Sequence, residues 1–214
     1  MKSLLTVYFL FLITILFAQK LPQPPKTDAI GKESLWESFE KKDTYDILVR
    51  TKKIAILPVS SAYFAKNIDS DSLQKYQNWL DTISVEIQEA YFMLLIKKTL
   101  SAAIQNPKET NKILNQKGLL NRESLKQTPK NTLCFILGVD AVMFVDITME
   151  LTKNTLVTAS SEEIAIGLRL YEKSNGDFFW ANRLTAKLKY GISPDYVFTN
   201  AIRESFQSIP FVIK

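Results

Sequence analysis

Histidine is absent from this sequence of 214 residues, and cysteine occurs once, as Cys134. Without histidine the chain cannot build a Ser-His-Asp triad, a Cys-His dyad or a His-ligated zinc or haem site. A single cysteine excludes an intramolecular disulfide, a cysteine-rich zinc site and a cysteine-ligated iron–sulfur cluster. The six glycines do not cluster into a phosphate-binding loop. We therefore expect no catalytic residues, no metal site and no cofactor.

The N-terminus has the three-part pattern of a secretory signal peptide. A basic start at Lys2 is followed by the apolar run 4–17 and by the small residue Ala18. The run is shorter than the roughly 20 residues that a membrane-spanning helix needs. We predict that residues 1–18 are a cleaved signal peptide, with an uncleaved anchor as the alternative. Because Cys134 lies far from the cleavage site, we expect an exported protein of the periplasm, or of the periplasmic face of the outer membrane, that is not a lipoprotein.

Positive charge is in small excess, with 27 lysines and arginines against 22 acidic residues and a formal charge of +5. Loss of residues 1–18 would remove one lysine, Lys2, and lower this charge to +4. The surplus is scattered in pairs such as Lys52-Lys53 and forms no dense basic arm. This distribution does not favour nucleic-acid binding, and it leaves peripheral contact with a membrane or the cell wall open.

The rest of the chain divides into an extension and one domain. Residues 19–49 contain Pro22, Pro24 and Pro25, which are typical of an extended spacer, and a short helix is predicted over 32–42. Residues 50–214 are predicted to form a single α+β domain.

Two periodicities define the elements of this domain. A continuous apolar run at 53–59 predicts a buried strand, and apolar spacings of three and four from Leu73 onward predict a long helix. After Asp140 the period changes to two, and in the second strand of this region Gly167 and Arg169 fall opposite the apolar face. The predicted sheet is mainly antiparallel, with about four strands packed against a long helix and a C-terminal helix (strands 53–59, 141–151, 163–172 and 178–190; helices 72–104 and 194–208).

Two serines follow the first strand and raise the question of nucleophilic catalysis. Ser60 and Ser61 are predicted to lie in a loop, without a nucleophile elbow around them. No histidine is present to activate them, and a Ser-Lys dyad with Lys66 or Lys52 is formally possible. A periplasmic hydrolase with histidine-free Ser/Lys or carboxylate chemistry is therefore kept as an alternative to a non-enzymatic protein.

The spacing of the carboxylates does not favour acid–base catalysis or a cation site. Asp140 and Asp146 would be about 20 Å apart on one extended strand, too far for a glycosidase pair, so Asp140 is better explained as a loop residue. Glu162-Glu163 with Asp177 or Asp195 could hold a cation, although solvated loop charges are the simpler interpretation. Cys134 is expected to be a buried, inert thiol.

Aromatic side chains supply the candidate partner contacts. They flank a predicted hairpin and widen the apolar face of the long helix, and aromatic residues are favoured at protein interfaces. Trp180 is instead expected to pack in the core. The candidate contacts are Tyr171, Phe178, Phe179, Tyr91 and Phe92.

Four segments resemble a group of bacterial envelope proteins. The group includes the curli-secretion channel family, the outer-membrane activators of penicillin-binding proteins, the N-terminal domain of the Tol-system propeller protein and related envelope lipoproteins. The resemblance implies an α+β domain that binds envelope proteins or self-assembles and is not an enzyme; a subunit of an envelope secretion complex is a further alternative. The chain departs from several members in lacking a lipobox cysteine. The resembling segments are 53–59, 137–142, 168–180 and 208–210.

Overall fold

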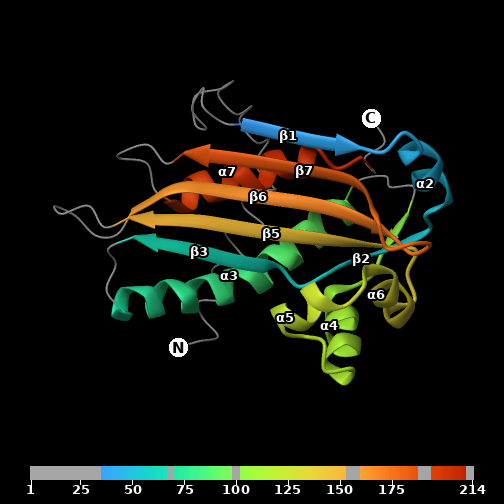
Figure 1. Ribbon diagram of the computed structural model, residues 1–214, viewed down its shortest axis with the longest axis horizontal. Coiled ribbons are helices and arrows are strands. Elements are labelled where there is room, and N and C mark those ends of the chain that lie inside the picture. The colour runs from blue at the N-terminus through green and yellow to red at the C-terminus, as the bar shows by residue number, and fades with distance from the viewer. Residues whose placement is uncertain (1–34, 67–69, 98–101, 153–159, 188–193, 211–214) are drawn as a thin grey trace.

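The computed structural model describes residues 35–66, 70–97, 102–152, 160–187 and 194–210, so the predicted signal peptide and prolines 22–25 lie outside it. These residues form seven strands and six helices in an α+β arrangement (Figure 1). In chain order the elements are β1 (Leu35–Glu40), α2 (Thr44–Arg50), β2 (Lys53–Ile56), β3 (Ser60–Lys66), α3 (Ser70–Ile96), β4 (Ala103–Ile104), α4 (Pro107–Gln116), α5 (Arg122–Gln127), α6 (Lys130–Leu137), β5 (Ala141–Thr152), β6 (Ser160–Glu172), β7 (Phe178–Lys187) and α7 (Pro194–Gln207).

The seven strands form one mixed sheet. Its order is β1-β7-β6-β5-β2-β4, and β3 also pairs with β5. Neighbours from β1 to β5 are antiparallel, whereas β2 and β3 run parallel to β5 and β4 runs parallel to β2. The predicted α+β class and the β5–β6–β7 meander are confirmed, but a mainly antiparallel sheet of four strands is wrong. Helical crossovers such as α3 return the chain to the same end of the sheet, which makes the connected strands parallel.

β2 and β3 lie end to end along one side of β5. β2 pairs with Ala141–Met143 and β3 with Asp146–Thr152. Between them lies Pro58, which has no N–H to donate to a ladder. The predicted loop at Ser60 and Ser61 is therefore wrong, because the long β5 extends beyond β2 and offers its remaining backbone groups to a second parallel strand.

The N-terminal elements also differ from the prediction. The short helix predicted over 32–42 is replaced, from residue 35 on, by β1, which pairs with β7. β1 and most of α2 fall within the stretch 19–49 that the sequence places in an extension, yet they belong to the sheet and its core. The helix predicted over 72–104 ends at Ile96, and its last two predicted residues form β4. The C-terminal helix agrees with its prediction to one residue.

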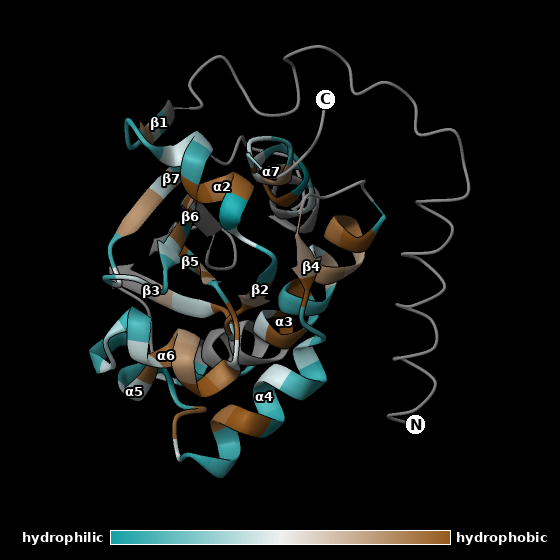
Figure 2. Ribbon diagram, turned by 90° about the vertical axis from the view of Figure 1, so that its right-hand side faces the viewer, coloured by the Kyte–Doolittle hydropathy of each residue, from teal (hydrophilic) through white to brown (hydrophobic). Residues whose placement is uncertain are grey.

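The sheet separates two hydrophobic clusters. The larger cluster lies under α2, α3 and α7 and includes Ile147 on β5, and the smaller lies under α4, α5 and α6 and includes Val142 and Phe144. Figure 2 shows these helices around the sheet. Beyond Phe144 the second face of β5 carries the polar, partly exposed residues Asp146 and Thr148. Half of one sheet face is thus left without a helix over it in the described part of the chain.

Within the described ranges, no helix combines the length and the apolar character that crossing a membrane requires.

Candidate functional site: a basic groove on the open half of the sheet

One cross-strand row of residues crosses the uncovered half of the sheet. The register aligns Ser60 on β3, Asp146 on β5, Gly167 on β6, Arg183 on β7 and Glu37 on β1. Residues paired directly across neighbouring strands project from the same face. Figure 1 is viewed onto the broad face of the sheet, with α7 behind the strands and α5 beside their lower margin. The topology therefore brings polar and charged side chains from four strands into one line, with Gly167 of β6 between them.

This row forms the bottom of a groove of about 560 Å³. Small residues keep the groove open, because Ala62, Ala165, Gly167 and Ala181 all line it. A Cβ placed at Gly167 would lie 3.7 Å from the Asp146 Cβ, which is ordinary van der Waals contact. The hollow thus follows from the short side chains on these strands.

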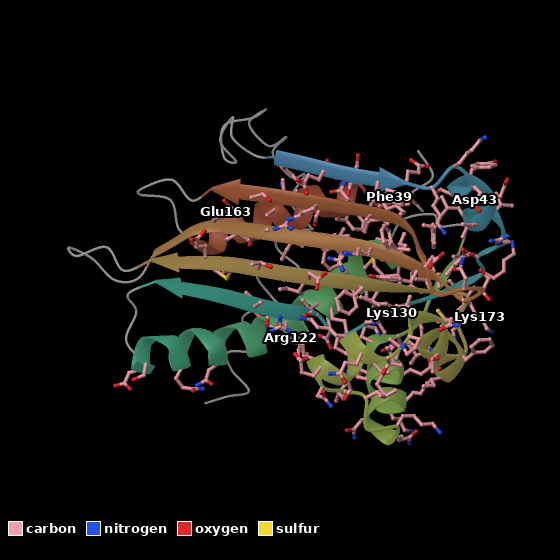
Figure 3. All side chains as sticks on the ribbon, viewed as in Figure 1. Phe39, Asp43, Arg122, Lys130, Glu163 and Lys173 are labelled. Carbon is pink, nitrogen blue, oxygen red and sulfur yellow. The ribbon has the colours of Figure 1, made fainter. Side chains whose placement is uncertain are left out.

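Four cationic side chains line the groove. Arg122 and Lys126 come from α5, and Arg169 and Arg183 come from β6 and β7. Arg122 and Lys126 are four residues apart, so both lie on one side of their helix. Figure 3 shows Arg122 and the β1 residue Phe39 at opposite margins of this part of the sheet. The groove therefore has one basic helical wall and a partly basic floor.

The basic wall is held by capping at both ends of α5. At its start the Asn121 side chain accepts a hydrogen bond from the Ser124 N–H at 2.9 Å. At its end the Lys130 ammonium donates to three backbone carbonyl oxygens and lies 5.4 Å from the centre of the Phe144 ring. Burial lowers the pKa of Lys130. These contacts fix α5 against the sheet although it has only six residues.

Asp146 sits among these cations. Its Oδ2 lies 3.0 Å from an Arg169 guanidinium nitrogen, and this oxygen is buried without a well-aligned hydrogen bond among the described residues. Burial raises the pKa of the Asp146 carboxyl, although Arg169 and three further cations act in the opposite direction. Burial lowers the pKa of the Arg169 guanidinium, but the neighbouring Tyr171 and Asp146 raise it, and the net shift is upward.

The raised pKa of Asp146 predicts how stability depends on pH. A carboxyl with a raised folded-state pKa binds its proton more tightly when folded, so its ionised form disfavours folding above that pKa. Asp146→Asn should therefore raise the melting temperature at pH about 7.5, and this gain should shrink as the pH falls towards about 4, the ordinary value of an aspartate. Thermal unfolding followed by circular dichroism at several pH values measures this.

The matched control is Asp43→Asn, which removes one negative charge from an exposed position. A variant Asp146→Asn that is less stable than the wild type at every pH would show that the ion pair with Arg169 outweighs the cost of burying the carboxylate.

Aromatic rings form one end of the groove. Phe39 and Phe178 line it, and their centroids are 5.0 Å apart in an edge-to-face arrangement. Tyr171 meets Phe178 in the same way at 6.1 Å. Phe39 is 44% and Phe178 is 39% exposed. An apolar, partly exposed surface thus adjoins the basic groove.

The five aromatic residues predicted as partner contacts lie in different surroundings. Tyr91 and Phe179 are completely buried, and Phe92 packs at the margin of the larger core cluster. Phe178 is exposed and lines the groove, whereas Tyr171 is partly buried and packs against the smaller core cluster. Of the five, Phe178 is therefore the most exposed candidate for a partner contact, while Tyr91 and Phe179 serve the core of this chain. Trp180 is buried, as predicted.

The serines considered for a hydrolase are both buried in β3. The Ser61 hydroxyl accepts a hydrogen bond from Ser84 on α3 at 3.2 Å, whereas Ser60 lies in the groove opposite Asp146. Lys52 donates to the Val49 carbonyl, and the Lys66 side chain lies outside the described residues. The described contacts therefore do not bring Lys52 to either serine.

The carboxylates considered for acid–base or cation chemistry serve the backbone and ion pairs. Asp140 accepts hydrogen bonds from the N–H groups of Lys52 and Lys53 at 2.9 and 3.0 Å, which confirms its prediction as a loop residue. Asp177 pairs with Lys41 at 3.3 Å. The side chains of Glu162 and Asp195 lie outside the described residues, and the described ones contain no cluster of three or more metal-binding side chains.

Cys134 is fully buried in α6, as predicted. Burial raises the pKa of its thiol to about 12, so the reactive thiolate is scarce at neutral pH.

Comparison with protein-family models gives one match. A family described as "Putative lipoprotein GNA1162-like" matches residues 102–198, which is a little under half of the chain. Among curated proteins, none matches this sequence.

Several solved structures resemble the chain at low identity. Lipoprotein GNA1162 from Neisseria meningitidis is 15% identical over 74% of this chain and 99% of that chain, with a TM-score of 0.45. A PelC dodecamer from Paraburkholderia phytofirmans is 12% identical over 80% and 93%, with a TM-score of 0.39. The LpoB C-terminal domain from Salmonella enterica is 11% identical over 64% and 84%, with a TM-score of 0.33. Likenesses this distant say nothing about activity.

The family match supports the envelope-lipoprotein part of the predicted resemblance, without pointing to one member of that group. It contradicts the expectation that this protein is not a lipoprotein, because the matched family is described as one. That expectation rests only on the separation of Ala18 and Cys134 in the sequence, whereas the match rests on residues of the folded domain.

Proposed function

We propose that this chain is a non-enzymatic, exported protein of the cell envelope that acts as a protein-interaction or assembly module. The lipoprotein description of the family that matches residues 102–198 supports the envelope. The proposal of a binding module rests on the sheet topology. Among the described strands, β1 pairs only with β7 and β3 pairs only with β5, so each leaves one backbone edge to other partners.

An unpaired edge strand is a template for a further strand from another chain. The β1 edge is the better placed of the two, because it stands at the end of the sheet (Figure 1). The Lys41 N–H donates to the Phe179 carbonyl at 2.9 Å. Since inward and outward N–H groups alternate along an antiparallel strand, the N–H of Phe39 points towards β7 and that of Ser38 points away from the sheet.

The outward N–H of Ser38 permits a selective test. A photo-crosslinking amino acid at Glu40, which is exposed on β1, should give a discrete adduct in intact cells, whereas the same probe at Lys112 on α4 should give none. Ser38→Pro should lower the adduct yield about fivefold, because the loss of one backbone hydrogen bond corresponds to about 1 kcal/mol. Ser38→Ala keeps the N–H and should retain the adduct.

The mass of the adduct distinguishes self-assembly from binding to another envelope protein. A mass of two chains indicates self-assembly, and another mass indicates a different envelope protein, which mass spectrometry identifies. Static light scattering on residues 19–214 then gives the size of any self-assembly. A yield at Glu40 that Ser38→Pro leaves unchanged, or no adduct at all, contradicts docking at β1.

A further inference from the structure

We propose that the basic groove binds a phosphate monoester that carries an apolar substituent. The groove shares Glu37, Ser38 and Phe39 with β1, but the ligand site does not use the outward backbone N–H groups of that strand and does not depend on protein docking there. The phosphate would lie between the cations of α5 and those of β6 and β7, and the apolar part would lie against Phe39 and Phe178.

The charge of the groove favours a dianion. Arg122, Lys126, Arg169 and Arg183 face the carboxylates of Glu37 and Asp146, which leaves the lining with a net charge of +2. A phosphate monoester carries a charge of about −1.5 to −2 at neutral pH. The charges of ligand and groove would therefore nearly cancel.

The cations are also available for binding. Arg169 is already paired with Asp146 at 3.0 Å, whereas the side chains of Arg122, Lys126 and Arg183 form no hydrogen bond or ion pair with any other described residue. Arginine presents a planar fork of donors that matches the oxygens of a phosphate, and lysine adds a mobile point charge. Three unpaired cations around one concave surface are thus ready to donate to one anion.

The shape of the groove suits a small amphiphile. Its volume of about 560 Å³ lies in the range of small-molecule sites, about 300–1,000 Å³. Gly167 and Ala165 on its floor have at most one carbon in their side chains, so a ligand can approach the sheet closely. The Phe39–Phe178 pair gives the groove an aromatic end, which inorganic phosphate alone would leave uncovered.

Isothermal titration calorimetry on residues 19–214 tests the site with dihexanoyl phosphatidic acid as the probe. Glycerol phosphate and inorganic phosphate serve as anions without an apolar part. We expect dihexanoyl phosphatidic acid to bind at least about tenfold more tightly than glycerol phosphate or inorganic phosphate. The reason is that each of the two or more methylene groups it buries contributes about 0.8 kcal/mol.

Matched charge variants locate the site. Arg122→Gln/Lys126→Gln should weaken binding at least tenfold, since each hydrogen bond to a charged group contributes about 1.5–3 kcal/mol. Lys108→Gln/Lys112→Gln removes the same charge at the same spacing from exposed positions on α4 and should change affinity less than twofold. Circular dichroism verifies that both variants are folded.

Gly167→Leu provides a second, independent variant that fills the floor and should abolish binding without a change of charge. Equal affinity for glycerol phosphate and dihexanoyl phosphatidic acid overturns the proposal, as does equal weakening by the two double variants or unchanged binding in Gly167→Leu.

Phosphatidylcholine vesicles that contain or lack phosphatidic acid distinguish a membrane lipid from a soluble phosphoester as the source of the ligand. Binding to the former that Arg122→Gln/Lys126→Gln abolishes indicates a membrane lipid, whereas binding of only the monomeric probe indicates a soluble phosphoester. Both results support the site. Because this test does not use the β1 edge, its failure leaves the crosslinking result at Glu40 unaffected.

Discussion

Phe179→Ala should destabilise the protein by about 3–5 kcal/mol, a large share of the roughly 5–15 kcal/mol by which a typical domain is stable. Phe179 is completely buried in the larger core cluster, where it packs beneath α2. Its backbone carbonyl accepts hydrogen bonds from the Lys41 N–H and the Thr44 hydroxyl, which attach the turn after β1 to β7. Removing the ring would leave a cavity at the point where β1 and α2 join the sheet. Urea denaturation followed by circular dichroism measures the loss.

The neighbouring residue is the matched control. Phe178 is 39% exposed, so Phe178→Ala loses mainly its edge-to-face contacts with Phe39 and Tyr171 and should cost about 1 kcal/mol. Similar losses for Phe178→Ala and Phe179→Ala would contradict the assignment of one ring to the core and of the other to the surface. The sequence analysis gives both residues the single role of a partner contact, and this pair of variants tests whether Phe179 belongs to the core instead.

Gln88→Met should cost about 2–3 kcal/mol in unfolding free energy, although methionine has nearly the same size as glutamine. The buried Gln88 amide on α3 donates to the Ile56 carbonyl at 2.8 Å and exchanges two hydrogen bonds with the Asn111 amide on α4, at 3.1 and 2.9 Å. The substitution leaves the Asn111 amide without this partner in a partly buried place. Urea denaturation again provides the measurement.

A double-mutant cycle shows whether unsatisfied polar groups cause this loss. Asn111→Leu alone leaves Gln88 without its reciprocal partner, whereas Gln88→Met/Asn111→Leu replaces both partners with apolar groups and should cost less than the sum of the single changes. Gln74→Met, at an exposed position of the same helix, should change stability by less than about 0.5 kcal/mol. Strict additivity of the two single changes would argue against coupling between α3 and α4 through this amide pair.

The meander shows what local sequence patterns can predict. Strand β5 was predicted over 141–151 and extends over Ala141–Thr152, because alternating residues face two different surroundings. Helix α7 was likewise predictable from Pro194 at its start and its apolar spacing. Both elements have a periodic apolar face, and such periodicity is the primary indicator of secondary structure in a single sequence.

β1 and β3 lack such a signal. Their sequences, LWESFE and SSAYFAK, mix polar and apolar residues without a clear period. Each is a strand because a longer strand beside it, β7 or β5, offers unpaired backbone groups. Strand pairing is a long-range interaction, so neither the strands nor the parallel direction of β3 could be read locally.

The groove was accessible to sequence analysis only in fragments. Gly167 and Arg169 were placed on the face opposite the apolar one, and this placement holds. Arg122 and Lys126 show an interval of four on a short helix, a pattern common to many solvated helices. Nothing in the order of the chain indicates that the cations of α5 line the same groove as Arg169 on β6.

Composition by itself determined that histidine chemistry, an intramolecular disulfide and cysteine-rich metal sites are excluded, because the chain has no histidine and a single cysteine. Periodicity determined the α+β class and the central meander, because burial of one face of a strand or helix produces a repeating pattern of apolar residues in the sequence. Only the tertiary structure decided that four cations, two carboxylates and an aromatic pair line one groove. That convergence depends on strand register and on the position of α5, which are set by packing between segments far apart in the sequence.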